Sequence, residues 1–332
     1  MPRLNIGRST LFDSAIASHK IMHEFDEIYK LVDWSKIEKL LSCIYSSESG
    51  GASYPPLMMF RAMLLQVWHN LSDVQAEKQL YRDLLFRRFC GLSLMDTVPD
   101  HSTISRFRNQ LTKAGLYGKL LDEINNQLAA KGAIVKVGEV SIVDATVIEA
   151  HQCRKKPGVK KENTQDPEAG WSVKTGTKGK KEFTYGFKAH ANVDEDGFVK
   201  KVKTTAGNIH DSQVVEEILT GTEVSLYGDS AYAGQSIADM LASKGIENRI
   251  NKRAYRNTPL TENAKEENGV MSSVRYVVER TFGSKKRHYG AGKTRLLGIE
   301  KVHSWITTIS IAHNLKKAAA ILRPGPLEPN YV

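Results

Sequence analysis

Three acidic residues stand where a sheet-based active site would hold them. Asp144 follows the apolar run Val140–Val143, and Asp229 follows the run Val224–Gly228, so each aspartate is predicted in or at the end of a central strand. Glu279 lies within a predicted helix. Two strand aspartates and one helix glutamate can bind a pair of Mg²⁺ or Mn²⁺ ions, which activate water and stabilise the leaving oxygen in phosphodiester cleavage.

Each acid alone is weak evidence, because carboxylates often end strands or balance a neighbouring arginine. Their shared context in a basic protein favours the metal hypothesis. If they hold metal ions, the carboxylates of Asp144, Asp229 and Glu279 should converge within a few ångströms, although long stretches of sequence separate them.

The positive charge of the chain is local. Lys and Arg (47) exceed Asp and Glu (37), which gives a net charge of +10. The stretch Ile148–Thr184 holds nine basic against five acidic residues, and Arg275–Arg295 holds seven against one, so these two stretches carry the whole excess. A solvated charged face is the usual explanation for one such run. Two runs that carry all of the imbalance favour a surface that binds a polyanion, such as nucleic acid or anionic lipid.

The first half of the chain is predicted to be all-α. Apolar residues recur at helical spacing from Phe25 to Leu128, and Ser72 and Asp100 are typical helix caps. Four or five short helices, with Arg106 and Arg108 on the last of them, suit a helix-turn-helix-like bundle that places one helix in the major groove of DNA. A bundle formed only for packing explains the pattern equally well.

The second half has the pattern of a mixed α/β sheet covered by helices. Helices are expected at 212–219, 236–244, 271–288 and 300–322. The expected strands are Val140–Ile148, Tyr185–Val193, Phe198–Thr205, Val224–Tyr227 and Ile246–Ile250. Between the first two strands, residues 150–184 form a basic, glycine-containing segment that we interpret as a mobile loop, in which Lys178, Lys180 and Lys181 contact DNA phosphates.

Cysteine usage and hydropathy favour a cytoplasmic protein. The three cysteines form no CxxC pair, and no stretch approaches about 20 uninterrupted apolar residues. The N-terminus lacks the apolar segment of a signal peptide. We therefore expect a cytoplasmic, nucleoid-associated protein with no membrane partner.

Three sequence blocks resemble the motifs of bacterial insertion-sequence transposases of the DDE type, specifically the fifth numbered insertion-sequence family within the larger group of the fourth. These blocks are Ser141–Ala150, Tyr227–Tyr232 and Arg275–Phe282 with Lys286. The last block of that group places Tyr, Arg, Glu and Lys at fixed spacing. Arg275, Glu279 and Lys286 fit this spacing, whereas Ser272 stands at the tyrosine position.

The resemblance extends from about Asp33 to Leu322. Further matching blocks are Tyr54–Leu57, Leu71–Asp73, Phe89–Ser93, Val98–Thr103, Asp166–Glu168, Gly186–His190 and Gly207–Asp211. The resemblance implies an RNase-H-like catalytic fold, divalent-metal dependence, and binding to double-stranded DNA, both the terminal inverted repeats of the element and the target. It also implies a homodimer or larger assembly on the paired ends.

The resemblance further implies a role for each site residue. Asp144 and Asp229 would hold both ions, and Glu279 would complete one coordination sphere. Arg275 and Lys286 would hold DNA phosphates, although a solvated helix surface, or an ion pair of Arg275 with Glu279, is the plainer explanation. Two further candidates, His210 and Asp211, would lie near the metal ligands. A role as a helix N-cap is equally compatible with Asp211.

We therefore expect four segments along the chain: a flexible arm (1–24), a helical DNA-binding domain (25–132), an RNase-H-like catalytic domain (133–322) and a disordered tail (323–332). The leading hypothesis is a DNA transposase that cleaves and joins strands. A metal-dependent nuclease without strand transfer would use the same acids. A catalytically silent DNA-binding regulator derived from a transposase is a third possibility, and the intact acid triad argues against it.

Overall fold

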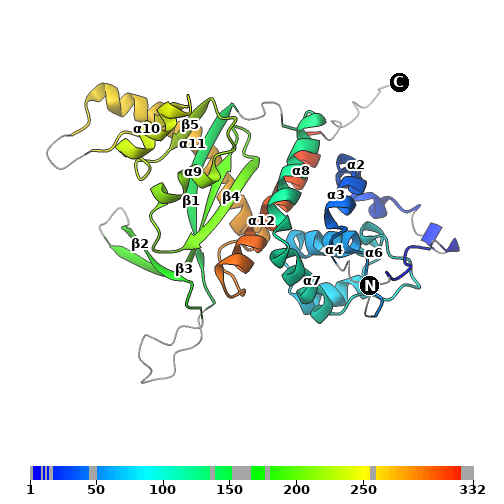
Figure 1. Ribbon diagram of the computed structural model, residues 1–332. Coiled ribbons are helices and arrows are strands. Elements are labelled where there is room, and N and C mark those ends of the chain that lie inside the picture. Colours follow the sequence, from blue (N-terminus) through cyan, green and yellow to red (C-terminus); the bar gives the residue numbers. More distant parts are fainter. Residues whose placement is uncertain are drawn as a thin grey trace, which may run out of the picture. The chain divides into compact units, whose positions relative to one another are not determined.

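The chain folds into two compact units (Figure 1). The computed structural model describes residues 3–8, 10–11, 13–14, 18–44, 51–134, 139–151, 166–175, 180–254 and 259–322. One unit comprises Met1–Val135 with Ile311–Val332, and the other comprises Lys136–Ser310. The last helix, α12 (Ile299–Ile321), is therefore divided between the two units, whereas the catalytic domain expected from the sequence, 133–322, contains all of it.

The first unit is helical, as predicted. Its elements are η1 (Lys20–His23), α2 (Asp26–Leu31), α3 (Trp34–Leu41), α4 (Pro56–Trp68), α5 (Asp73–Arg82), α6 (Leu84–Cys90), α7 (His101–Lys113) and α8 (Leu116–Ala130). Ser72 forms a capping box with Gln75 at the start of α5, and Asp100 caps α7, so both predicted helix starts are confirmed. The described part holds more helices than the expected four or five, because Asp33 and Asp83 each cap a further short helix.

The C-terminal part of α12 belongs to the helical unit for a packing reason. The Trp68 indole Nε1 donates a hydrogen bond to the Ala312 carbonyl oxygen at 3.0 Å. The Trp68 ring also stacks on Phe25, with ring centroids 5.5 Å apart, and the Lys316 ammonium lies 4.9 Å from the Phe25 ring centroid. Trp68 is thus a core residue rather than a surface aromatic.

Backbone amides of the N-terminal arm form hydrogen bonds with the helical unit. The Leu4 amide donates to the Ser53 carbonyl oxygen at 2.9 Å, and the Gly7 amide donates to Asp96 Oδ2 at 2.8 Å. These bonds give Leu4 and Gly7 partners in the helical unit, and the flexibility of the arm stays a prediction. The predicted disordered tail, 323–332, lies outside the described residues.

The second unit is built on one mixed sheet. Its strands are β1 (Val140–Glu149), β2 (Gly170–Thr175), β3 (Lys181–Val193), β4 (Val199–Ala206), β5 (Ser225–Gly228) and β6 (Glu247–Ile250). Antiparallel pairs join β4 to β3 and β3 to β1, and parallel pairs join β1 to β5 and β5 to β6. This order and these directions are those of an RNase-H-like sheet, so the expected fold class is confirmed.

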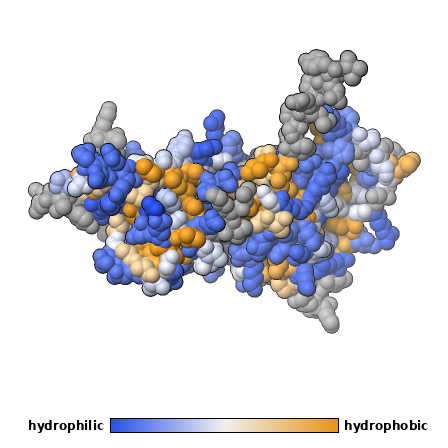
Figure 2. Space-filling view, turned by 90° about the horizontal axis from the view of Figure 1, so that it is seen from above, coloured by the Kyte–Doolittle hydropathy of each residue, from blue (hydrophilic) through white to orange (hydrophobic). Residues whose placement is uncertain are grey.

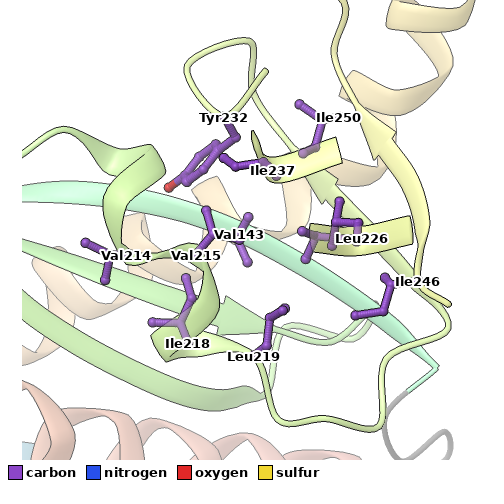
Figure 3. Close-up of a cluster of buried hydrophobic side chains, with 11 residues drawn as sticks. Val143, Val214, Val215, Ile218, Leu219, Leu226, Tyr232, Ile237, Ile246 and Ile250 are labelled. Atoms are coloured by element: carbon purple, nitrogen blue, oxygen red, sulfur yellow. The ribbon is translucent and has the colours of Figure 1, made fainter. Parts of the chain in front are cut away.

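Helices surround this sheet. They are η2 (Asp211–Val214), α9 (Val215–Ile218), α10 (Gln235–Ser243), α11 (Glu262–Tyr289) and the first part of α12. A cluster of buried side chains, which includes Val143 of β1, Leu226 of β5 and Leu241 of α10, joins the sheet to the short helices (Figure 3). Helix α11 packs against β1 and β5, the two strands that lead to the predicted aspartates.

The prediction of one continuous loop over residues 150–184 is wrong. Residues 170–175 form β2, which pairs antiparallel with the first part of β3. In β2 the exposed Trp171 and Val173 alternate with the buried Ser172, a strand pattern that the surrounding glycines and lysines obscure. Residues 152–165 and 176–179, which include Lys178, lie outside the described residues.

Hydrophilic side chains cover most of the face seen in Figure 2, with smaller apolar patches between them. Among the described residues, no helix combines the length and the hydropathy that crossing a membrane requires.

Candidate active site

The register of two parallel strands brings the two predicted aspartates together. Ile142 of β1 is the partner of Tyr227 of β5. Asp144 stands two residues further along β1, and Asp229 comes directly after the end of β5, so the two aspartates occupy neighbouring places at this strand pair. The charge of Asp229 acts on Asp144, which agrees with this placement. Backbone amides fix both carboxylates: Ala145 donates to Asp144 Oδ1 and Ala231 to Asp229 Oδ1, each at 2.8 Å.

Helix α11 supplies the third acid and a cation. Arg275 Nη2 lies 4.0 Å from Asp144 Oδ2, and the arginine side chain is 12% exposed. Glu279 follows one helical turn later and is exposed. The ion pair of Arg275 is thus with Asp144, whereas the sequence alternative was a pair with Glu279. The buried Arg275 Nε has no hydrogen-bond partner in the described structure.

Electrostatics link the three acids. Burial, the largest cause, and the negative charges of Asp229 and Glu279 together raise the pKa of Asp144 to about 6, against the Ala145 amide and Arg275, which lower it. A largely buried carboxylate with two other acids near it is costly to ionise unless positive charge is also near. One guanidinium at 4.0 Å supplies only part of that charge.

The acids do not form a closed ligand set. Within the described residues, no three His, Cys, Asp or Glu side chains already stand close enough to hold a metal ion. The donor set nevertheless fits a hard divalent cation, since it consists of carboxylate oxygens with an unmet need for positive charge.

The structure distinguishes the two residues predicted beside the metal ligands. His210 caps η2 by accepting from the Ser212 amide at 3.3 Å, so the alternative that Asp211 is the N-cap is wrong. Asp211 instead accepts a hydrogen bond of 2.9 Å from Lys188 Nζ and lies 3.9 Å from His190 Nδ1. The Asp211 charge also helps to raise the pKa of the Tyr232 hydroxyl, as do Asp144 and Asp229, so Asp211 faces the same region.

Two of these partners, Lys188 and His190, were not singled out by sequence. Both lie in the Gly186–His190 block, and only the antiparallel pairing of β3 with β1 sets them beside the acids. The His190 ring is buried and its Nε2 is 2.9 Å from Thr205 Oγ1. Burial lowers the pKa of His190 to about 4, so the ring is neutral at pH 7.

Several lysines near the sheet are free for an anionic partner. Lys180 and Lys181 are exposed, as is Lys286 on α11. Although the residue as a whole is exposed, partial burial of the Lys286 ammonium lowers its pKa, and so does the like charge of Lys174 on β2, which indicates that these two cations lie near each other. Lys174 was counted in the basic stretch but not predicted as a DNA contact. Lys285 is different, because it is buried and donates to Ser310 Oγ at 2.8 Å.

The two arginines predicted on the DNA-facing helix differ. Arg106 is exposed at the surface of α7, where its Nη2 donates to Ser102 and Thr103 hydroxyls at 3.1 Å. Arg108 is 13% exposed and forms an ion pair with Asp73, with a further hydrogen bond to Gln66. A guanidinium held by these groups is not free for a phosphate, so the structure argues against a DNA contact by Arg108.

Comparison with known families decides the identity. A model described as "Transposase DDE domain" matches residues 136–315, more than half of the chain, and one described as "Transposase domain (DUF772)" matches residues 16–110. The chain belongs to the DDE transposase family. It is therefore a DDE-type DNA transposase, and membership of this family implies use of a divalent metal ion. The finer assignment to one numbered insertion-sequence family remains a prediction.

Solved transposase structures show a distant similarity. The Mos1 strand transfer complex and the Mos1 transposase paired-end complex with left transposon end are each 11% identical, with a TM-score of 0.20. The matches cover 83% of this chain and 81% or 82% of the Mos1 chains. The Mos1 mariner paired end complex with Mn is also 11% identical, over 87% of this chain and 85% of that one, with a TM-score of 0.21. These scores are too low for residues to be equated between the proteins.

Proposed function

We propose that this transposase binds the terminal inverted repeats of its element and cleaves and joins DNA strands at Asp144, Asp229 and Glu279. The acids come from two neighbouring strands and one helix, and the charges of Asp229 and Glu279 both raise the pKa of Asp144, which supports the proposal. Asp144 and Asp229 would hold two Mg²⁺ or Mn²⁺ ions and Glu279 would complete one coordination sphere. We also propose a homodimer or larger assembly on the paired ends, associated with the nucleoid.

Bound metal ions would supply Lewis acidity to the phosphodiester and lower the pKa of water. Asp144 Oδ1 accepts a hydrogen bond from the Ala145 amide, and its second oxygen lies 4.0 Å from Arg275 Nη2. Arg275 neutralises part of the Asp144 charge and can contact a scissile phosphate. Lys286 and Lys174 attract the DNA backbone beside the site, and Arg106 is a candidate contact in the helical unit.

Strand transfer separates the candidate activities. Wild-type protein incubated with labelled inverted-repeat ends, a target plasmid and Mg²⁺ should give joined products, since the freed 3′-hydroxyl attacks target DNA in line. Cleavage without joining would instead indicate a nuclease. Binding with neither activity, in Mg²⁺ and in Mn²⁺, would indicate a regulator.

Replacing Lys178, Lys180 and Lys181 by Ala should weaken binding to DNA of any sequence. Each phosphate contact that is lost should reduce the slope of log affinity against log salt by about 0.9. Fluorescence anisotropy with end DNA and unrelated DNA, at several salt concentrations, measures both effects. The control is the double substitution of Lys244 and Lys265, whose ammonium groups pair with Glu216 and Glu262. Lost sequence preference with an unchanged salt slope would contradict the phosphate-binding role.

A further inference from the structure

Tyr232 carries a polar group that the described structure does not satisfy. The side chain is fully buried, and its hydroxyl oxygen has no hydrogen-bond partner. A buried hydroxyl without a partner costs free energy relative to the same hydroxyl in water. A phenylalanine would fill the same space without that cost, so the hydroxyl calls for an explanation beyond packing.

The backbone holds Tyr232 in this position. The Tyr232 amide donates to the Asp229 carbonyl oxygen at 3.0 Å, in the same turn in which the Ala231 amide binds the Asp229 carboxylate. The ring lies against β5 at Gly228, where an added Cβ would stand 3.2 Å from Tyr232 Cδ2. A glycine at the end of β5 therefore lets the ring lie close behind Asp229.

The ring and the hydroxyl face different surroundings. The ring packs in the cluster that contains Val143 and Ile237. Figure 3 shows that the hydroxyl end of the ring points away from Ile237 and Ile250. Burial raises the pKa of Tyr232 well above its usual value, and the charges of Asp144, Asp211 and Asp229 raise it further. The hydroxyl is thus a protonated, buried donor on which the charges of three carboxylates act, and it bonds to none of them.

We propose that the Tyr232 hydroxyl is a positioning group for the metal site. It donates its hydrogen bond to a water molecule held among Asp144, Asp211 and Asp229 once a divalent cation is bound there. The inference rests on the proposed function of these acids. Tyr232 touches no DNA in this role; it orients the water and the carboxylates that surround the cation.

The proposal makes opposite predictions for the metal-free and the metal-bound protein. Without metal, Tyr232→Phe removes an unsatisfied hydroxyl, so the melting temperature should stay equal or rise. With metal, the variant lacks one hydrogen bond around the site, and the affinity for Mn²⁺ should fall about ten-fold. The kcat of end cleavage should fall, while the KM for DNA stays unchanged.

The test measures Mn²⁺ binding to the full chain by electron paramagnetic resonance, with melting curves at each metal concentration. Tyr185→Phe is the matched control, because its hydroxyl donates to the Asp166 carbonyl oxygen at 2.8 Å. That variant should melt lower without metal and bind Mn²⁺ as the wild type does. Wild-type Mn²⁺ affinity in Tyr232→Phe would overturn the inference.

Asp144→Asn separates this inference from the function beneath it. If Asp144→Asn loses Mn²⁺ binding and Tyr232→Phe does not, only the role of Tyr232 fails. If Asp144→Asn also binds Mn²⁺ as the wild type does, the proposed metal site fails, and the role of Tyr232 fails with it.

Discussion

Asp144→Asn should reduce DNA cleavage and joining by about 10³-fold or more and leave the binding of end DNA intact. The amide has nearly the volume of the carboxylate, and its oxygen can still accept the hydrogen bond from the Ala145 amide. It lacks the negative charge that holds a divalent cation. Single-turnover cleavage of labelled ends and a gel-shift assay measure the two properties separately.

The same substitution should stabilise the metal-free protein at alkaline pH. The folded state raises the pKa of Asp144 from 3.8 to about 6, so folded Asp144 retains a proton that the unfolded chain has lost between these values. The stability contribution of Asp144 therefore falls as the pH rises through this window. The full cost above it is about 3 kcal/mol, at 1.36 kcal/mol per pKa unit.

Urea unfolding of wild type and Asp144→Asn, without metal, tests the sign. The variant should be more stable at pH 8, and the difference should become small near pH 4 and vanish below it, where Asp144 is protonated in the folded and in the unfolded chain. Asp239→Asn is the control, because Asp239 is exposed on α10 and should show neither effect. An equal gain at pH 4 and pH 8 would contradict the electrostatic explanation, and retained cleavage would contradict the catalytic one.

Local patterns in the sequence predict the strands that carry the aspartates. The apolar, β-branched runs before Asp144 and Asp229 coincide with β1 and β5 to within one or two residues. A strand buried in a parallel sheet needs such an apolar run, so the end of the run can be located in the sequence before the neighbouring strand is known. The pairing of the two strands is not local, and the resemblance to transposases was needed to combine their acids into one site.

Elements with a polar composition could not be predicted in the same way. The first turns of α11, Glu262–Val270, are mostly polar and exposed, so they lack the apolar periodicity that predicted the helix from Met271. Nor can a sequence show that Arg108 is held by Asp73, or that the Tyr232 hydroxyl faces three acids. Those contacts depend on which helices and strands pack together, and residue type alone does not determine that packing.

Gly186→Ala should prevent stable folding of the sheet unit, at a cost above about 4 kcal/mol. Gly186 of β3 is the register partner of both Glu149 of β1 and Gly170 of β2. A Cβ there would lie 2.0 Å from the Ile148 carbonyl oxygen and 2.8 Å from the Ala150 amide nitrogen. Both atoms belong to backbone, so no rotamer change relieves the overlap, and β3 must separate from β1 on the strand that carries Asp144.

Circular dichroism in urea and limited proteolysis of the full chain measure this loss. Gly269→Ala is the control for the same chemical change, because an added Cβ there meets nothing within 4 Å and the residue is exposed on α11. An alanine in a helix interior should stabilise that variant by about 0.5–1 kcal/mol. If Gly186→Ala unfolds within about 1 kcal/mol of the wild type, steric overlap at this strand crossing is not what requires glycine. If Gly186→Ala fails to fold while Gly269→Ala folds, the close approach of β3 to β1 is what requires glycine at position 186.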